Sequence, residues 1–166
     1  MLAEHGMDFP EAQFYALAGM PTVAIIRQLA AEQGVTLGDD QPAEMSHRKE
    51  SLYVSMIDDV QAVPEVYAIA KRYRDELPMA VASGGDSWVV KRTLQAIGVL
   101  DWMQAVVGAE DTERHKPEPD VFLEAARRLG VDAPACAVFE DSDLGLLAAR
   151  RAGMESVDIR PWRKVR

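Results

Sequence analysis

Residues 136–154 read CAVFEDSDLGLLAARRAGM and combine a short apolar run, two adjacent acids and a helix-like stretch. The apolar residues before Glu140 are typical of a buried strand, and the residues from Leu144 onward have the spacing of a helix. Neighbouring carboxylates repel each other unless a cation, a proton or water relieves them. The stretch therefore predicts a strand-to-helix loop at Glu140 and Asp141 that needs a positive charge beside it.

The same alternation of strand and helix occurs before and after this stretch. Apolar runs are found at residues 77–83, 104–110, 136–141 and 156–160, and helix-like segments at residues 86–98, 119–130 and 144–153. The runs are short and nearly continuous, which is typical of strands that are buried on both faces of a parallel sheet. The sequence therefore predicts an α/β core with a doubly wound parallel sheet.

The first sixty residues differ from the rest because they favour helices. Residues 21–34 place apolar side chains near helical spacing. Residues 36–46 are turn-rich, and the helical pattern resumes over residues 47–60. We expect an α-helical module over residues 1–60 and an α/β core over residues 61–166.

The composition argues against several classes of protein. The 166 residues carry a net charge of −9, whereas binding to a nucleic-acid backbone depends on basic clusters. The single cysteine, Cys136, rules out an intrachain disulfide and a cysteine-based metal site and is typical of a reducing compartment. Neither a basic leader nor a long apolar segment occurs near the beginning of the sequence. We therefore expect a cytoplasmic protein with no nucleic-acid or membrane partner.

Loops of chemical interest follow the predicted strands, and ligands of such sheets bind outside the carboxyl ends of the strands. The first loop is Ser83-Gly84-Gly85, which ends one strand and starts a helix. A hydroxyl and backbone amides at this position favour an anion such as phosphate. An ordinary tight turn is the alternative interpretation of these glycines.

A lysine occupies the second loop, in the sequence HKPEPD of residues 115–120. Pro117 biases Lys116 toward an extended backbone, and Pro119 suits the first turn of the next helix. A lysine held in this way can direct its charge at a bound anion. An ordinary solvated lysine is the alternative interpretation.

The third loop carries the two adjacent acids, Glu140 and Asp141. Carboxylate oxygens at a strand end, completed by water, suit Mg²⁺. Alternatively, Asp141 or Ser142 caps the following helix. A cap accounts for one acid but not for two, so the sequence favours a magnesium site.

The three loops together form a constellation that is typical of phosphoryl transfer. Their order, A-S-G-G at 82–85, H-K-P-E-P-D at 115–120 and F-E-D-S-D-L-G at 139–145, resembles motifs two, three and four of the haloacid dehalogenase superfamily. More narrowly, the chain is similar to the β-phosphoglucomutase-like branch of sugar-phosphate phosphatases and mutases. The sequences AGMPT at 18–22 and YVSMIDDV at 53–60 resemble the helical cap of that branch.

The resemblance implies a haloacid dehalogenase-like α/β fold with a helical cap. It also implies a Mg²⁺-dependent phosphatase that acts on a small phosphorylated sugar through an aspartyl-phosphate. Ser83 with the Gly84 amide would hold the transferring phosphoryl group, and Lys116 would bridge that group and the carboxylate of the nucleophile. The substrate-binding residues would be Ser83, Gly84, Gly85, Asp86 and Lys116. Asp141 would be a ligand of Mg²⁺, with Glu140 as a second ligand or a water-mediated partner.

The cap sequence bears on the choice between phosphatase and mutase. By resemblance, a mutase would carry a lysine at the position of Ser55 and an arginine at about Thr22. Both are absent, and the G-x-P-T form of the loop looks more like phosphatases of the fructose-1-phosphate type. Hydrolysis is therefore favoured, with a phosphosugar mutase as the alternative.

One motif of the family is missing from the expected order. The first motif, D-x-D-G-T, supplies the aspartate that attacks phosphorus from the end of the first, central strand, and no such segment precedes the cap-like residues. Asp141-Ser142-Asp143 does not replace it, because Leu144 stands where glycine belongs. We therefore expect an N-terminally shortened copy that is inactive alone. Its sheet would lack a middle strand, and each unpaired buried backbone group would cost about 1–3 kcal/mol of stability.

Two other interpretations are compatible with parts of the pattern. A non-catalytic remnant would keep the loops and bind phosphate ligands or a protein partner without turnover. A phosphorelay receiver also combines acids, a hydroxyl and a lysine around a parallel sheet. Receivers present the acidic pair first in the chain, whereas Glu140 and Asp141 come last, so this interpretation is set aside.

Overall fold

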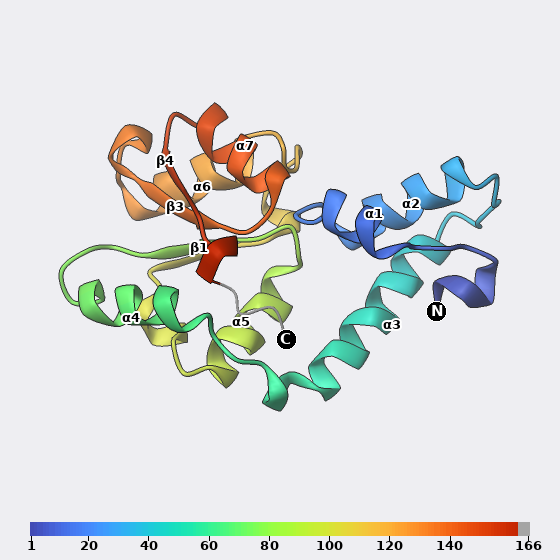
Figure 1. Ribbon diagram of the computed structural model, residues 1–166, viewed down its shortest axis with the longest axis horizontal. Coiled ribbons are helices and arrows are strands. Elements are labelled where there is room, and N and C mark those ends of the chain that lie inside the picture. Colours follow the sequence, from blue (N-terminus) through green and yellow to red (C-terminus); the bar gives the residue numbers. More distant parts are fainter. Residues whose placement is uncertain (163–166) are drawn as a thin grey trace.

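A helical part and an α/β part lie side by side in the computed structural model, which describes residues 1–162 (Figure 1). The helical part contains α1 (Glu11–Ala16), α2 (Thr22–Glu32) and α3 (Gln41–Ser55). The helices of the α/β part are α4 (Pro64–Tyr73), α5 (Ser87–Ala96), α6 (Asp120–Leu129) and α7 (Asp143–Arg151). Its strands are β1 (Ala80–Ala82), β2 (Ala105–Val107), β3 (Ala137–Glu140) and β4 (Glu155–Asp158). The predicted α/β fold with parallel strands is thereby confirmed.

The helical part has a small core of its own between α2 and α3. Its buried residues are Met7, Ile26, Leu29, Ala30 and Met45. The prediction that residues 36–46 form turns is wrong for the last six of them, because α3 already begins at Gln41. Proline is tolerated in the first turn of a helix, and burial of Met45 against α2 stabilises this start.

The strands form two parallel pairs that are separate from each other. Ala80, Val81 and Ala82 of β1 pair with Ala105, Val106 and Val107 of β2. Strand β3 pairs with β4 from Ala137↔Glu155 to Glu140↔Asp158. No ladder joins β1 to β3 within residues 1–162. The expected gap in the middle of the sheet is therefore present in the described residues.

Helices α6 and α7 hold the two strand pairs together. Helix α6 contacts β1, β2 and α7, and α7 contacts β3 and β4. The buried residues of this core are Val107, Val121, Phe122, Ala125, Ala126, Ala148, Ala149, Ala152 and Met154. These side chains come from the elements around both strand pairs. Burial of their apolar surface therefore holds together two strand pairs that no backbone ladder joins in the described residues.

Strand β3 departs from the prediction that the strands are buried on both faces. Ala137 is exposed and Phe139 is 36% exposed, whereas Val138 packs on the core and Glu140 is buried. Successive side chains of a strand point to opposite faces, so only the face with Val138 and Glu140 is covered. The exposed face has a ring contact between Phe139 and Trp162, with 6.2 Å between the centroids.

None of the helices in residues 1–162 is long and apolar enough to cross a membrane.

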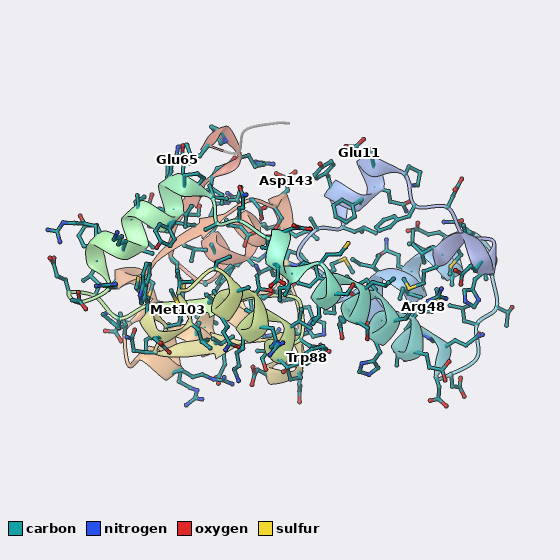
Figure 2. The ribbon with its side chains drawn as sticks, turned by 90° about the horizontal axis from the view of Figure 1, so that it is seen from below. Glu11, Arg48, Glu65, Trp88, Met103 and Asp143 are labelled. Carbon is teal, nitrogen blue, oxygen red and sulfur yellow. The ribbon has the colours of Figure 1, made fainter. Side chains whose placement is uncertain are left out.

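The connection between the two parts, residues 60–63, has no regular secondary structure and leads into Pro64, the first residue of α4. Helix α3 also contacts α5, so the two parts meet at a seam as well as at the connection (Figure 2).

The core of the helical part predicts a specific response to truncation of leucine. Leu29 is 0% exposed, and Leu29→Ala should lower the free energy of unfolding by about 2–5 kcal/mol because it leaves a cavity. Leu52 on α3 is 54% exposed, and Leu52→Ala should change it by no more than about 0.5 kcal/mol. Urea unfolding followed by circular dichroism measures both values, and equal losses in the two variants would contradict the packing of α2 against α3.

Candidate active site

The Lys116 ammonium lies between the carboxyl ends of β1 and β3. Its Nζ donates to Glu140 Oε2 at 2.8 Å and to the Ala82 carbonyl at 3.4 Å. The ammonium also lies 4.7 Å from the centroid of the Phe122 ring, and the residue is only 6% exposed. One buried lysine therefore connects the ends of two strands between which the described residues form no backbone hydrogen bond.

The Glu140 carboxylate is fully engaged in this contact. Its Oε1 accepts hydrogen bonds from the Ser142 amide at 3.0 Å and from the Ser142 hydroxyl at 2.6 Å, while Oε2 accepts from Lys116. Burial raises the pKa of the Glu140 carboxyl, but the Lys116 charge and these hydrogen bonds outweigh it, so the pKa is lowered overall. The side chain is therefore held as an anion inside the protein.

Gly145 leaves the space that the Glu140 side chain occupies. A Cβ at position 145 would lie 2.1 Å from the Glu140 carboxyl carbon, which no real contact permits. The Gly145 amide donates to the Ser142 hydroxyl at 3.0 Å, so Ser142 is the N-cap of α7. The capping interpretation thus applies to Ser142 and accounts for neither Glu140 nor Asp141. Asp143 pairs with Arg160 at 2.8 Å, as expected for a structural residue.

The Ser83 loop continues directly from β1. The Ser83 amide donates to the Val107 carbonyl at 3.0 Å, and the Ser83 hydroxyl accepts from the Gly85 amide at 3.1 Å. The Gly84 amide makes no hydrogen bond within the described part of the chain. The Lys116 ammonium donates to the carbonyl of Ala82, the residue just before Ser83, so it lies beside the start of this loop. The Gly84 amide is therefore available to an anion bound next to the lysine.

A loop of the helical part closes over the same place. Gly19, with φ of 96°, lies so near that a Cβ on it would be 3.1 Å from the Ser142 hydroxyl and 3.3 Å from Lys116 Cδ. A Cβ on Gly84 would in turn lie 2.2 Å from the Gly19 carbonyl oxygen. Figure 1 shows this loop, before α2, reaching toward the α/β part. Both glycines are therefore required for the loop at 18–22 to approach the lysine.

Asp86 differs from the other predicted site residues because it has an electrostatic effect on the helical part. It is the N-cap residue of α5 without a side-chain capping bond, and its charge acts on Glu50 of α3. The structure therefore gathers the Ser83 loop, Lys116, Glu140 and Asp141 at one edge and places Asp86 at the seam with α3. Sequence reasoning did not identify Glu50, because an acid in the polar sequence of α3 reads as a solvated residue.

The acids of this site fit a divalent cation in part. Residues 1–162 contain no group of three His, Cys, Asp or Glu side chains that could hold a metal ion. Asp141 is exposed at the loop and suits Mg²⁺, which binds one or two carboxylates and takes its other ligands from water or phosphate. Both Glu140 oxygens already accept hydrogen bonds from Lys116 or Ser142, which favours a water-mediated role for Glu140 over direct ligation.

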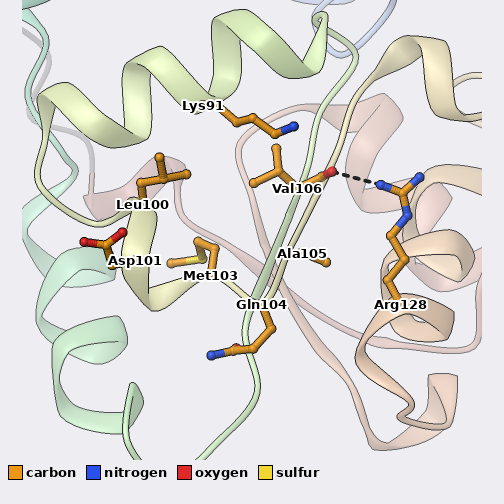
Figure 3. Close-up of a pocket in the computed structure, with 8 residues that line it drawn as sticks. All are labelled: Lys91, Leu100, Asp101, Met103, Gln104, Ala105, Val106 and Arg128. Atoms are coloured by element: carbon orange, nitrogen blue, oxygen red, sulfur yellow. Dashed lines mark hydrogen bonds between the residues drawn. The ribbon is translucent and has the colours of Figure 1, made fainter.

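A hollow of about 630 Å³ lies elsewhere, along the outer edge of β2 (Figure 3). Its lining includes Lys91 of α5, Gln104 and Arg128 of α6, and Arg128 Nη1 donates to the Val106 carbonyl at 3.1 Å. This bond covers a free backbone acceptor of an edge strand, which discourages pairing with other chains. The hollow does not include the Ser83 loop, Lys116 or Glu140, so we do not assign the candidate site to it.

Comparisons with known proteins show the family to which the chain belongs. The haloacid dehalogenase-like hydrolase family matches residues 1–159 of the chain. The fructose-1-phosphate phosphatase YqaB of Escherichia coli (strain K12) is 35% identical over 160 residues, which are 96% of this chain and 84% of that protein. The β-phosphoglucomutase of Bacillus subtilis (strain 168) is 28% identical over 120 residues, which are 70% of this chain and 52% of that protein.

A solved structure shows the same fold. The β-phosphoglucomutase from Clostridium difficile superposes with a TM-score of 0.84 at 20% identity, covering 95% of this chain and 72% of that one. The chain belongs to the haloacid dehalogenase-like hydrolase family. The resemblance inferred from the three loops is confirmed, while the individual roles of the loop residues stay predictions.

The buried ion pair predicts a large loss of stability when one partner is removed. Lys116→Met leaves the Glu140 carboxylate buried without its cation and should lower the free energy of unfolding by about 3–5 kcal/mol. Adding Glu140→Gln removes the remaining charge and should restore part of the loss. Urea unfolding measures the cycle, with exposed Lys91→Met as the control. A double variant that is less stable than Lys116→Met would contradict this pairing.

The lowered pKa of Glu140 predicts a dependence of stability on pH. The folded pKa lies below the ordinary value of 4.5, so the contribution is complete above pH 4.5 and is lost as the pH falls through the folded pKa. Other carboxylates titrate in the same range, so the measurement is the difference in unfolding free energy between the wild type and Glu140→Gln from pH 7 to pH 3. A difference that stays constant over this range would show that Glu140 is not held as an anion.

Proposed function

We propose that the chain serves a Mg²⁺-dependent phosphatase reaction on a small phosphorylated sugar in the cytoplasm. The observation that carries the proposal is the position of Lys116, with its ammonium beside the end of β1 and the Ser83 loop. The 35% identity to the fructose-1-phosphate phosphatase YqaB, over 84% of its length, supports a sugar phosphate as the substrate class. Residues 1–60 would act as the cap over this site.

The loops offer donors for a phosphoryl group. The Ser83 hydroxyl and the Gly84 amide would donate to its oxygens, and the Gly85 amide would join them on leaving the Ser83 hydroxyl, to which it now donates. Lys116 would neutralise charge from the side of β3. Positioned donors of this kind stabilise the charge that develops in the transition state. Mg²⁺, held by Asp141 with Glu140 acting through water, would supply the remaining positive charge when bound.

The reaction also needs a carboxylate nucleophile next to Lys116. Glu140 is a poor candidate, because both of its oxygens accept hydrogen bonds and its charge is paired. We propose that a further strand, placed between the free edges of β1 and β3, brings an aspartate to the lysine. That aspartate would take the phosphoryl group as the bond from phosphorus to the sugar oxygen breaks, and the second aspartate of D-x-D would protonate the leaving sugar oxygen. The same residue would then accept a proton from the water that hydrolyses the aspartyl-phosphate. Without this strand, residues 1–166 would bind phosphate without turnover.

A phosphosugar mutase is the second candidate, and one contact favours it. Lys49 Nζ donates to the Thr22 hydroxyl at 3.3 Å, so an ammonium stands beside the loop where a mutase would hold a second phosphate. Against it, Thr22 is not basic, and the Ser55 hydroxyl donates to the Leu52 carbonyl within its own helix at 2.7 Å. Hydrolysis therefore remains the favoured reaction.

The test is phosphate release by a longer form of the protein that includes a strand ending in D-x-D. We expect Mg²⁺-dependent release of inorganic phosphate from fructose 1-phosphate and from p-nitrophenyl phosphate. Lys116→Ala should lower kcat by about 10²–10³-fold, because a charged donor to the transition state is lost. The exposed Lys91→Ala serves as the control.

Two results would count against this function. Full retention of the rate in Lys116→Ala would remove the lysine from the mechanism. Conversion of a sugar monophosphate into its isomer without release of phosphate would favour the mutase.

A further inference from the structure

Helix α7 ends in an arginine that contacts the loop of the buried lysine. Arg151 Nη1 donates to the Pro117 carbonyl at 3.1 Å and to Glu118 Oε1 at 2.8 Å. Pro117 directly follows Lys116 in the chain. The Arg151 side chain therefore holds the backbone next to the residue whose ammonium lies at the candidate active site.

This loop has few backbone donors with which to hold itself in place. Pro117 and Pro119 have no N–H group. The Glu118 amide donates to the His115 carbonyl at 2.9 Å, which is a bond within the loop itself. The Pro117 carbonyl needs a donor from another element, and among the described residues Arg151 supplies it.

The contact of Arg151 adds little to the stability of the whole fold. The Arg151 and Glu118 side chains are 43% and 41% exposed. Exposed ion pairs contribute little to stability, because water and salt screen them. The hydrogen bond from the guanidinium to the Pro117 carbonyl is stronger than one between neutral groups, but it acts on one loop. Its main effect is therefore on the position of the backbone beside Lys116.

Helix α7 contacts both partners of the buried ion pair. Ser142, the residue that caps its start, donates to Glu140 Oε1 through its amide and its hydroxyl. Arg151, its last residue, holds the loop of Lys116. The Lys116 stem has little freedom, because it is 6% exposed and a Cβ on Gly19 would lie 3.3 Å from its Cδ. A shift of the loop backbone would therefore displace the ammonium.

We propose that Arg151 is a positioning residue, which fixes the Lys116 ammonium beside Glu140 through the Pro117 carbonyl. For its effect on phosphate, the inference rests on the proposed function, in which Lys116 neutralises charge on the bound phosphoryl group. A charged donor that is slightly misplaced contributes much less to binding and catalysis. Loss of the Arg151 side chain therefore loosens the lysine and weakens the anion site without unfolding the chain.

Chemical labelling of lysines tests the position of the ammonium. A lysine-acylating reagent is applied to the folded chain of 166 residues, and mass spectrometry measures the rate at each lysine. The exposed Lys91 should be labelled quickly and the buried Lys116 slowly. In Arg151→Gln the rate of Lys116 relative to Lys91 should rise by about 3- to 10-fold, because the loop opens more easily. A relative rate equal to that of the wild type would overturn the proposal.

Two control variants test whether charge or general loosening of the loop explains this effect. Arg150→Gln removes the same charge from an exposed position of the same helix and should leave Lys116 protected. Arg114→Gln breaks the ion pair with Asp120 at the end of the same loop, which joins Arg114 Nε and Asp120 Oδ1 at 2.9 Å. It should also leave Lys116 protected. Equal labelling of Lys116 in Arg114→Gln and Arg151→Gln would contradict a specific role of Arg151.

A third variant and thermal unfolding separate the carbonyl contact from the ion pair and from overall stability. Glu118→Gln removes the ion pair and leaves the Pro117 carbonyl to Arg151, so Lys116 should stay protected. Exposure of Lys116 equal to that in Arg151→Gln would contradict the role of the carbonyl. The Tm of Arg151→Gln should stay close to that of Glu118→Gln, because the exposed pair contributes little. A large fall in Tm with faster labelling of every buried lysine would assign Arg151 to the whole fold and overturn the proposal.

Phosphate binding separates this inference from the proposed function. Isothermal titration calorimetry with inorganic phosphate should show affinity weakened by about 3- to 10-fold in Arg151→Gln and unchanged in Arg150→Gln. If the wild type binds phosphate and Arg151→Gln changes neither affinity nor labelling, the role of Arg151 is wrong and the phosphate site stands. If the wild type binds no phosphate but Arg151→Gln exposes Lys116, Arg151 positions the lysine and the proposed phosphate site fails.

Discussion

The contact between the Lys116 ammonium and the Glu140 carboxylate, at 2.8 Å, lies where two separate pairs of strands come together. Apolar burial under α6 and α7 joins these pairs, but their edges share no ladder in the described residues. A buried ion pair contributes little net stability once desolvation is included, whereas its geometry is demanding. Its main effect is therefore to fix the position of the lysine. The Ser142 cap and Gly145 hold the carboxylate, and the carboxylate holds the ammonium beside the Ser83 loop.

The same edge explains why glycines are found on both sides of it. Gly84 has no Cβ that would meet the Gly19 carbonyl oxygen, and Gly19 has a φ of 96°, which other residues rarely adopt. This close approach covers the edge with backbone and excludes water from the charged groups, which strengthens electrostatic interactions there.

Much of this arrangement was predictable from the sequence because it depends on local rules. Strand-to-helix loops at Ser83, Lys116 and Glu140 follow from apolar runs that end in polar residues, and parallel strands bring such loops to one edge. The expectation that the edges of β1 and β3 would be unpaired agrees with the two separate strand pairs in the described residues. The start of α3 at Gln41 was missed, because burial of Met45 against α2 overrides a turn-rich composition.

The parts that were not predictable depend on tertiary contacts. Sequence gives no sign that the Glu140 carboxylate turns inward to Lys116 while Asp141 stays exposed, since the space comes from Gly145 on the next helix. The exposure of Phe139 depends on which face of β3 the helices cover. The burial of Glu50 depends on packing of α3 against α5, and no period in α3 distinguishes that polar residue from its solvated neighbours.

The assignment of phosphate to the edge at Lys116 can be measured residue by residue. In an NMR titration of the ¹⁵N-labelled chain with inorganic phosphate, the amides of Gly84 and Gly85 should shift in a saturable way, and Lys116→Ala should abolish the shift. Changes confined to the hollow around Lys91, Gln104 and Arg128, or shifts at Gly84 that persist without the lysine, would show that the Ser83 loop and Lys116 do not form one anion site.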